Sequence, residues 1–257
     1  MGAKTDVKKL VIQATLPLSG NAGSAGSDWK YLYDEITSLG GYGNLTDLEI
    51  DGPGAATIPE DAMHFSSVGS AWLEKLSLPS ATELKNFPFR YCTALVEADL
   101  PVARKIGIGA FDQDYQLASV NAPLLEECDD YALRACNGLR EISLPSLVRL
   151  GSQGFRNCIN LALISAPWLE EAGTFAFSDC RSLESITLPS LRTTGVYIFS
   201  YSTKLTRVIL PGNTLCTFQM SPFGNVILAP ANAVEIVVPA SLEAAYEKEQ
   251  EKEQNLQ

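Results

Sequence analysis

One hydrophobic phrase recurs every 22 residues between Leu73 and Pro211. It begins with a leucine, has an apolar residue three positions later and another two positions after that, and ends in a proline. The leading leucines are Leu73, Leu95, Leu117, Leu139, Leu161, Leu183 and Leu205. These in-phase copies predict a solenoid, in which each repeat is one coil that buries its apolar face against the neighbouring coils.

The first half of each repeat is predicted to be a short strand. Two inward side chains alternate with outward ones, and the proline ends the strand because it has no N–H for a continuing ladder. The rest of the repeat should return to the start through a turn and a short irregular or 3₁₀ segment. The strands of successive coils then form one parallel sheet, with about 4.8 Å between neighbours.

The second half of the repeat also has fixed positions. Four repeats carry a glycine that we expect to turn the chain tightly, namely Gly107, Gly151, Gly173 and Gly195. A predicted internal spine follows, formed by Phe89, Phe111, Leu133, Phe155, Phe177 and Phe199. Three residues later stand Cys92, Asp114, Cys136, Cys158, Cys180 and Ser202. The cysteines are expected to be buried free thiols, although neighbouring coils would also bring them close enough for a disulfide.

These motifs resemble the BspA-type leucine-rich repeats of bacterial surface proteins. Residues 139–160, LREISLPSLVRLGSQGFRNCIN, show the leucine phrase, the glycine and the Phe-x-x-Cys phrase together. The resemblance covers about residues 45–239. It implies an α/β-type solenoid that is mostly β and irregular, a right-handed leucine-rich repeat coil, and an exported, adhesive or ligand-binding role. Many unrelated binding proteins share this architecture, so it does not identify the partner.

Composition limits the function further. The chain has 257 residues and a formal net charge of −11, which argues against nucleic-acid or anionic-membrane partners. No apolar run is long enough to span a membrane. The N-terminal residues after Met1 lack the apolar core of a signal peptide, so we expect that an export leader has been removed from this chain.

The repeat divides the chain into four parts. Residues 1–44 are expected to hold a worn first strand and a helix over residues 27–39 that caps the solenoid; a partner-docking helix is the alternative. In that worn strand, alignment of Leu16-Pro17 with Leu78-Pro79 puts Val11 and Ala14 inward. Residues 45–211 form the solenoid proper, and residues 212–246 hold degenerate repeats and a last strand near residues 234–240. Residues 247–257 are predicted to be a charged, disordered tail.

The sequence offers no convincing catalytic or metal centre. His64 is the single histidine and has no nucleophile motif beside it. Glu126, Glu127, Asp129 and Asp130 form an acidic turn, which we interpret as a solvated edge rather than a weak cation site. We therefore expect a non-enzyme without a cofactor.

Outward positions of the predicted strands are the candidate binding surface. The residues that we select are Lys75, Glu97, Asn121, Glu141, Leu163, Trp168 and Arg207. Trp168 stands where other repeats have Ser80, Ser146 and Ser190, so it is either a contact residue or a filler over Leu163 or Leu191. Tyr131, Phe175 and Tyr197 share another position and form either an aromatic strip or internal packing.

The leading hypothesis is a non-catalytic binding or adhesion module, secreted or held at a bacterial cell surface. It would hold a protein or glycan partner on the sheet face, as a monomer. The alternative is a structural spacer or self-assembling scaffold without a soluble ligand.

Overall fold

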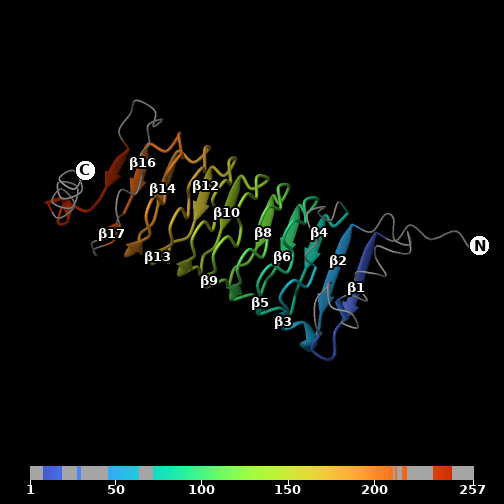
Figure 1. Cartoon of the computed structure of the whole chain (residues 1–257). Helices are drawn as coiled ribbons and strands as arrows, with labels where there is room; N and C mark the ends of the chain where they lie inside the picture. The colour runs from blue at the N-terminus through green and yellow to red at the C-terminus, as the bar shows by residue number, and fades with distance from the viewer. Residues whose placement is uncertain are drawn as a thin grey trace, which may run out of the picture.

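The structure is a computed structural model that describes residues 8–18, 28–29, 46–63, 72–210, 212, 216–218 and 234–244. These residues form one elongated solenoid whose coils follow one another along a single axis (Figure 1). The solenoid and its leucine-rich repeat character are therefore as predicted. In the part described, no helix is long and apolar enough to cross a membrane.

The predicted strands form a first ladder along the solenoid. Its members are β1 (Lys9–Gln13), β2 (Asp47–Asp51), β4 (Lys75–Ser77), β6 (Glu97–Asp99), β8 (Ser119–Asn121), β10 (Glu141–Ser143), β12 (Leu163–Ser165), β14 (Ser185–Thr187), β16 (Arg207–Ile209) and β18 (Glu235–Val237). Strand pairing is parallel throughout, and the hydrogen-bonded runs are β1-β2-β4-β6-β8, β10-β12 and β14-β16-β18. From β4 to β16, the middle residue of every strand is buried and the first is exposed, which is the alternation expected for a half-buried strand.

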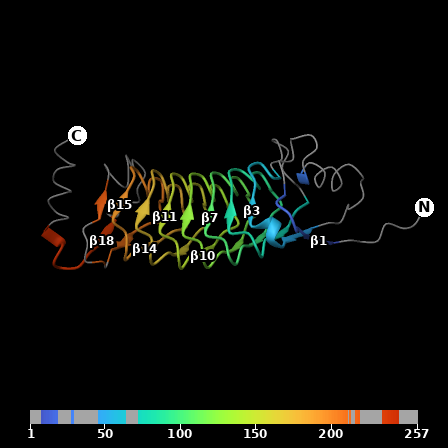
Figure 2. The ribbon, with the colours of Figure 1, turned by 90° about the horizontal axis from the view of Figure 1, so that it is seen from below.

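A second ladder corrects the expectation of one sheet. It consists of β3 (Thr57–Ile58), β5 (Glu83–Leu84), β7 (Lys105–Ile106), β9 (Glu127–Cys128), β11 (Arg149–Leu150), β13 (Glu171–Ala172), β15 (Thr193–Thr194) and β17 (Thr217–Phe218). These short strands form one parallel sheet of eight. Because coils of nearly constant length stack in register, any extended pair of residues meets its equivalent in the next coil and bonds to it. In Figure 2, β3, β7, β11 and β15 lie along one side of the ribbon, and β10, β14 and β18 along the other.

The core lies between the two ladders and the return segments. Leucines of the hydrophobic phrase, such as Leu73 and Leu139, are fully buried. The predicted aromatic spine is confirmed: the ring centroids of Phe155 and Phe177 are 6.0 Å apart, and their planes differ by 7°. Leu133 interrupts the stack between its two aromatic halves.

The four glycines act differently from the prediction. None of them has a left-handed backbone; instead, a Cβ at Gly173 would lie 2.5 Å from the backbone nitrogen of Ser152 in the preceding coil. Their role is close approach between coils. The left-handed turns use two other positions in each repeat. One position holds Phe87, Gly109, Tyr131, Gln153, Phe175 and Tyr197, and the other holds Tyr91, Gln113, Ala135, Asn157, Asp179 and Tyr201.

The N-terminal strand is present with a different register from the one expected. Ile12 pairs with Ile50, so the inward-alternating residues of β1 are Leu10 and Ile12. The expectation for Ala14, which is buried, is confirmed, and that for Val11, which is 47% exposed, is wrong. The leucine-proline pair that suggested the alignment follows the strand by three residues and does not end it. Pro53–Ala55 form a 3₁₀ turn, η1, in the longer coil that follows β2.

Most of the expected capping helix, His64 and the charged tail lie outside the described residues. Asp28 and Trp29 are helical, and Trp29 is buried. At the other end, β18 confirms the last strand of the phrase that ends at Pro239.

All six cysteines are buried and none forms a disulfide, as predicted for the four that stand three residues after the spine position. The thiol of Cys158 donates a hydrogen bond to the carbonyl oxygen of Leu133, at 3.1 Å, in the preceding coil. Burial raises the pKa of this thiol to about 12. These cysteines are therefore structural groups that join one coil to the next.

Candidate functional site

The first-ladder face carries the predicted contact residues. Lys75, Glu97, Glu141, Leu163 and Arg207 each take the exposed first position of a strand. Asn121, which ends β8, is exposed as well. The structure thus places six of the seven selected residues on one face: five form a row along the solenoid, and Asn121 lies in the adjacent outward row.

Cross-coil contacts engage both ends of this face. The Lys75 ammonium lies 3.3 Å from the Glu97 carboxylate. The Arg207 guanidinium lies 3.1 Å from the carboxylate of Glu235. Such exposed pairs contribute little to stability, about 0–1 kcal/mol each. Between these pairs, in the middle of the face around Glu141 and Leu163, an apolar side chain is exposed to solvent.

Leu163 and Trp168 are the large apolar side chains that stand out near this middle region. Leu163 is 58% exposed on β12, and Trp168 is 64% exposed. Trp168 follows the proline that ends β12, so it lies at the corner between the first and second ladders. With most of its surface in solvent, Trp168 does not fill a gap in the core.

Two serines that hold the position of Trp168 in other coils show one role of this corner. The hydroxyl of Ser146 donates to the carbonyl oxygen of Pro123, at 2.8 Å. The hydroxyl of Ser190 donates in the same way to Pro167, also at 2.8 Å. Serine at this position therefore joins its coil to the preceding one. Trp168 has no hydroxyl on its Cβ, so its coil lacks the bond that Ser146 and Ser190 make.

The second-ladder face is charged, and this face was not selected from the sequence. Its outward row alternates in sign along the solenoid, with Glu83, Lys105, Glu127, Arg149 and Glu171 in register. Lys105 lies 3.5 Å from Glu127 and 3.2 Å from Asp129, and Arg149 pairs with Glu127 from the other side. The signal in the sequence was the change of charge sign from each of these residues to the one 22 positions later. This pattern can be recognised once the second ladder is known.

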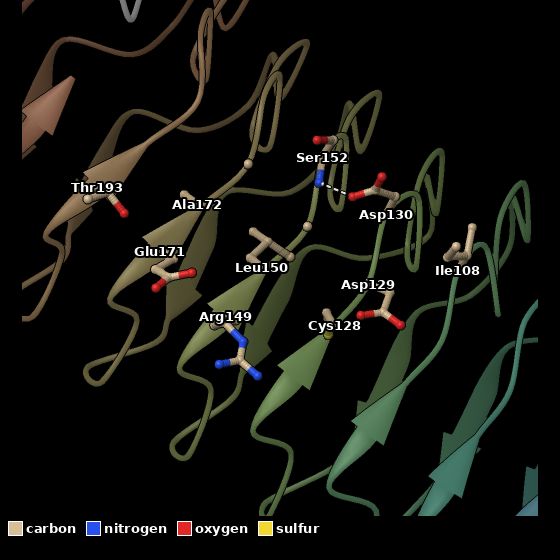
Figure 3. Close-up of a pocket in the computed structure, with 12 residues that line it drawn as sticks. Ile108, Cys128, Asp129, Asp130, Arg149, Leu150, Ser152, Glu171, Ala172 and Thr193 are labelled. Atoms are coloured by element: carbon tan, nitrogen blue, oxygen red, sulfur yellow. Dashed lines mark hydrogen bonds between the residues drawn. The ribbon is translucent and has the colours of Figure 1, made fainter. Parts of the chain in front are cut away.

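A hollow of about 560 Å³ lies on this second face (Figure 3). Gly151 and Gly173 belong to its lining, and charged or hydroxyl side chains surround it, including Asp129, Arg149 and Glu171. The volume is in the range of small-molecule sites, about 300–1,000 Å³. Its mixed charges do not single out one class of ligand.

The acidic turn does not assemble a cation site. Glu126 pairs with Arg104, Glu127 and Asp129 pair with neighbouring cations, and Asp130 accepts a hydrogen bond of 2.6 Å from the backbone N–H of Ser152. Figure 3 shows this last bond at the edge of the hollow. Among the described residues, no three histidine, cysteine or acidic side chains gather as metal ligands.

The remaining aromatic position is partly an aromatic strip. The rings of Phe175 and Tyr197 lie 5.4 Å apart. The guanidinium of Arg134 lies over the Tyr131 ring at 4.8 Å, and that of Arg156 over Phe175 at 5.2 Å. These half-buried rings serve chiefly to hold arginines on the return segments.

Solved structures of bacterial leucine-rich repeat proteins are similar to this chain. A protein from Bacteroides ovatus matches at 20% identity and a TM-score of 0.47, over 81% of this chain and 59% of its own. A leucine-rich repeat protein from T. pallidum matches at 22% identity and a TM-score of 0.48, over 65% of this chain and 76% of its own.

A protein from Faecalibacterium prausnitzii that is described as a leucine-rich cell surface protein matches at 16% identity and a TM-score of 0.42. That match covers 71% of this chain and 65% of the other. The chain thus spans less than two thirds of the length of two of these proteins. No curated protein matches the chain.

The family model described as the BspA-type leucine-rich repeat region matches residues 44–140 and 126–244 in six copies. These ranges together span both ladders from β2 to β18. The chain therefore belongs to the BspA-type leucine-rich repeat family.

Proposed function

We propose that this chain is a non-catalytic binding module that holds a partner at the junction of the first-ladder face and the Trp168 corner. The exposure of Trp168 is the observation that carries the proposal. Large aromatic residues are costly to leave in water, and they are enriched among the residues that dominate interfaces. Leu163 offers a second apolar contact on the same coil, from the opposite end of β12.

A protein partner fits this surface better than a glycan does. Leu163 and Trp168 present apolar surface, while the polar residues at either end of the face engage one another across coils. An interface with an apolar centre and a polar rim is typical of protein–protein contacts. We further propose that the module works outside the bacterial cell, held at the surface or secreted, as its family membership favours.

The test compares capture of partners by four forms of the chain. Wild type, Trp168→Ser, Leu163→Glu and Arg207→Ser are immobilised and exposed to bacterial-envelope and host-surface protein extracts. The first two substitutions address the proposed contact, and Arg207→Ser is the control because it alters the far end of the same face. Circular dichroism confirms that all four are folded.

The proposal expects a protein that wild type and Arg207→Ser retain and that both other variants lose. Removing a central aromatic contact typically costs 2 kcal/mol or more, which is a loss in affinity of about 30-fold. Retention of every captured protein by Trp168→Ser and Leu163→Glu alike would refute this location. Capture of nothing by wild type would favour a spacer or scaffold instead.

A further inference from the structure

A second hollow, of about 360 Å³, lies on the return segments between the two ladders. Its lining includes Gln113, Ala135 and Asn157, which occupy the same position in three successive coils. All three have left-handed backbones, with φ of 66°, 61° and 62°. Alanine in the middle coil is much smaller than its two neighbours, so the hollow exists where one side chain is short.

An aromatic ring is held at the edge of this hollow. Tyr115 is 43% exposed, and its hydroxyl donates a hydrogen bond of 2.6 Å to the side-chain oxygen of Gln113. The side-chain nitrogen of Gln113 donates in turn to the hydroxyl of Tyr91, at 3.1 Å. This chain of bonds fixes the ring before any ligand arrives. Ile159 adds an exposed aliphatic side chain to the same lining.

Two amides in the lining have hydrogen-bonding groups to offer. The side chain of Asn157 makes no hydrogen bond to another group in the part of the chain that the structure describes, and that of Asn137 accepts one long bond of 3.5 Å from the N–H of Ile159. An amide presents both donors and an acceptor, which matches a hydroxyl group, itself a donor and an acceptor.

The backbone around the hollow is already bonded. The N–H groups of Gln113, Ala135 and Asn157 donate to carbonyl oxygens of the next coil at 2.8, 2.8 and 2.9 Å. A peptide therefore finds no open strand edge with these donors, and recognition falls to the side chains.

The charge in this hollow is small. Arg134 is the single charged residue in the lining, and its Nε and Nη2 bind the two oxygens of buried Asp112 at 2.7 and 2.9 Å. Arg90 binds the same carboxylate from the opposite coil, at 3.0 Å. The hollow in Figure 3, by contrast, is lined by several carboxylates and a guanidinium. The return-segment hollow thus suits a ligand without charge.

We propose that this return-segment hollow binds a neutral sugar unit of a glycan. One face of the sugar ring packs on Tyr115 and Ile159, and its hydroxyls bond to Asn137 and Asn157. The proposal is independent of the Trp168 corner, because the hollow is built by different segments of the coil.

The test uses saturation-transfer NMR with lactose, maltose, cellobiose and di-N-acetylchitobiose as probes. Ala135→Asn fills the hollow with the residue of the next coil, and asparagine tolerates the left-handed backbone. Tyr115→Ala removes the ring. Tyr201→Ala is the control, since it removes an exposed aromatic side chain elsewhere on the solenoid.

The expected result is saturable binding of at least one neutral disaccharide by wild type and by the Tyr201→Ala control. Ala135→Asn should lose it, and Tyr115→Ala should weaken it by about 2- to 12-fold, the equivalent of one aromatic contact. Binding of none of the four probes would overturn the proposal. So would equal binding by Ala135→Asn, or preferential binding of the anionic sialyllactose over lactose.

Discussion

Asp114 stands three residues after the aromatic spine position, where the other coils have cysteine or serine, and its replacement by asparagine should stabilise the chain at neutral pH. Ser202 shows the local requirement: its hydroxyl donates to the carbonyl oxygen of Phe177 at 2.8 Å and accepts from the N–H of Cys180 at 3.1 Å. An ionised carboxylate can accept and cannot donate. Asp114 is fully buried, and neither of its oxygens makes a full hydrogen bond.

The surroundings of Asp114 favour its protonated form. Burial raises its pKa well above the usual value, and the nearby Asp112 carboxylate adds to this, while the facing N–H of Cys92 lowers it in part. Cys136, the neighbour in the next coil, is buried, and burial raises its pKa, so its thiol stays neutral and adds no charge beside Asp114. Arg90 and Arg134 are directed to Asp112 instead. As a neutral acid, Asp114 can donate to the Phe89 carbonyl as its sister residues do.

The sign of the pH effect follows from the raised pKa. The folded chain takes up a proton that the unfolded chain, with a pKa near 3.9, has lost. Stability from this group is complete below about pH 3.9 and falls as pH rises toward the folded pKa, by at most about 1.4 kcal/mol per pH unit. Asparagine supplies an N–H donor at every pH, so the advantage of Asp114→Asn should grow across that window.

The magnitude follows from the cost of an unsatisfied buried group. That cost is about 1–3 kcal/mol, so Asp114→Asn should raise the free energy of unfolding by this amount at pH 7 and by little near pH 4. Urea unfolding followed by circular dichroism from pH 4 to pH 8 measures the difference. Glu141→Gln is the control, because it removes an exposed charge. A loss of stability at pH 7, or a difference independent of pH, would refute the reasoning.

Three other substitutions or treatments test the packing. Asp112→Ala should destabilise the fold by about 3 kcal/mol in urea unfolding, because two arginines lose their shared buried carboxylate; a change below 1 kcal/mol would contradict this. Gly173→Ala should cost about 1–3 kcal/mol, since its Cβ would meet the Ser152 backbone, and an unchanged thermal midpoint would show that the coils separate freely. The six thiols should resist alkylation until the chain unfolds; rapid labelling of native Cys158 would contradict its burial.

The first ladder could be predicted because its signal is redundant. Each strand repeats the same inward pair and is followed by a proline, so a single residue such as Ala98 in place of Leu76 does not change the register. The register of the N-terminal strand was predicted from a single copy of the phrase, and that prediction was wrong. Leu16-Pro17 resembled the end of a strand, yet the alternation of Leu10 and Ile12 decided the register of β1.

The second ladder could not be seen in the same way. Its strands have two residues each, with one inward side chain. A single inward residue cannot show the alternation of apolar and polar positions that identifies a strand. The glycines were misread for a related reason: a glycine permits both a left-handed turn and a close approach, and the sequence does not distinguish them. Phe175 and Tyr197, two residues after Gly173 and Gly195, adopt the left-handed conformation instead, because the surrounding coils fix the turn.

The candidate surface was predicted in part. Outward positions on known strands follow from alternation, and Trp168 stood out because Ser80, Ser146 and Ser190 hold its position in three other repeats. The hollow beside Tyr115 was not found, because it depends on Ala135 lying between two longer side chains of neighbouring coils. That arrangement becomes visible only when the left-handed turns place residues 113, 135 and 157 side by side.

The most direct test of the central claim is the unfolding free energy of Trp168→Ser. If Trp168 is kept for a partner and not for packing, the variant should be as stable as wild type or gain up to about 1 kcal/mol, as a serine bond to Pro145 is restored. A loss of about 2 kcal/mol or more would show that Trp168 holds the coils together, and the claim of a contact residue at this corner would be wrong.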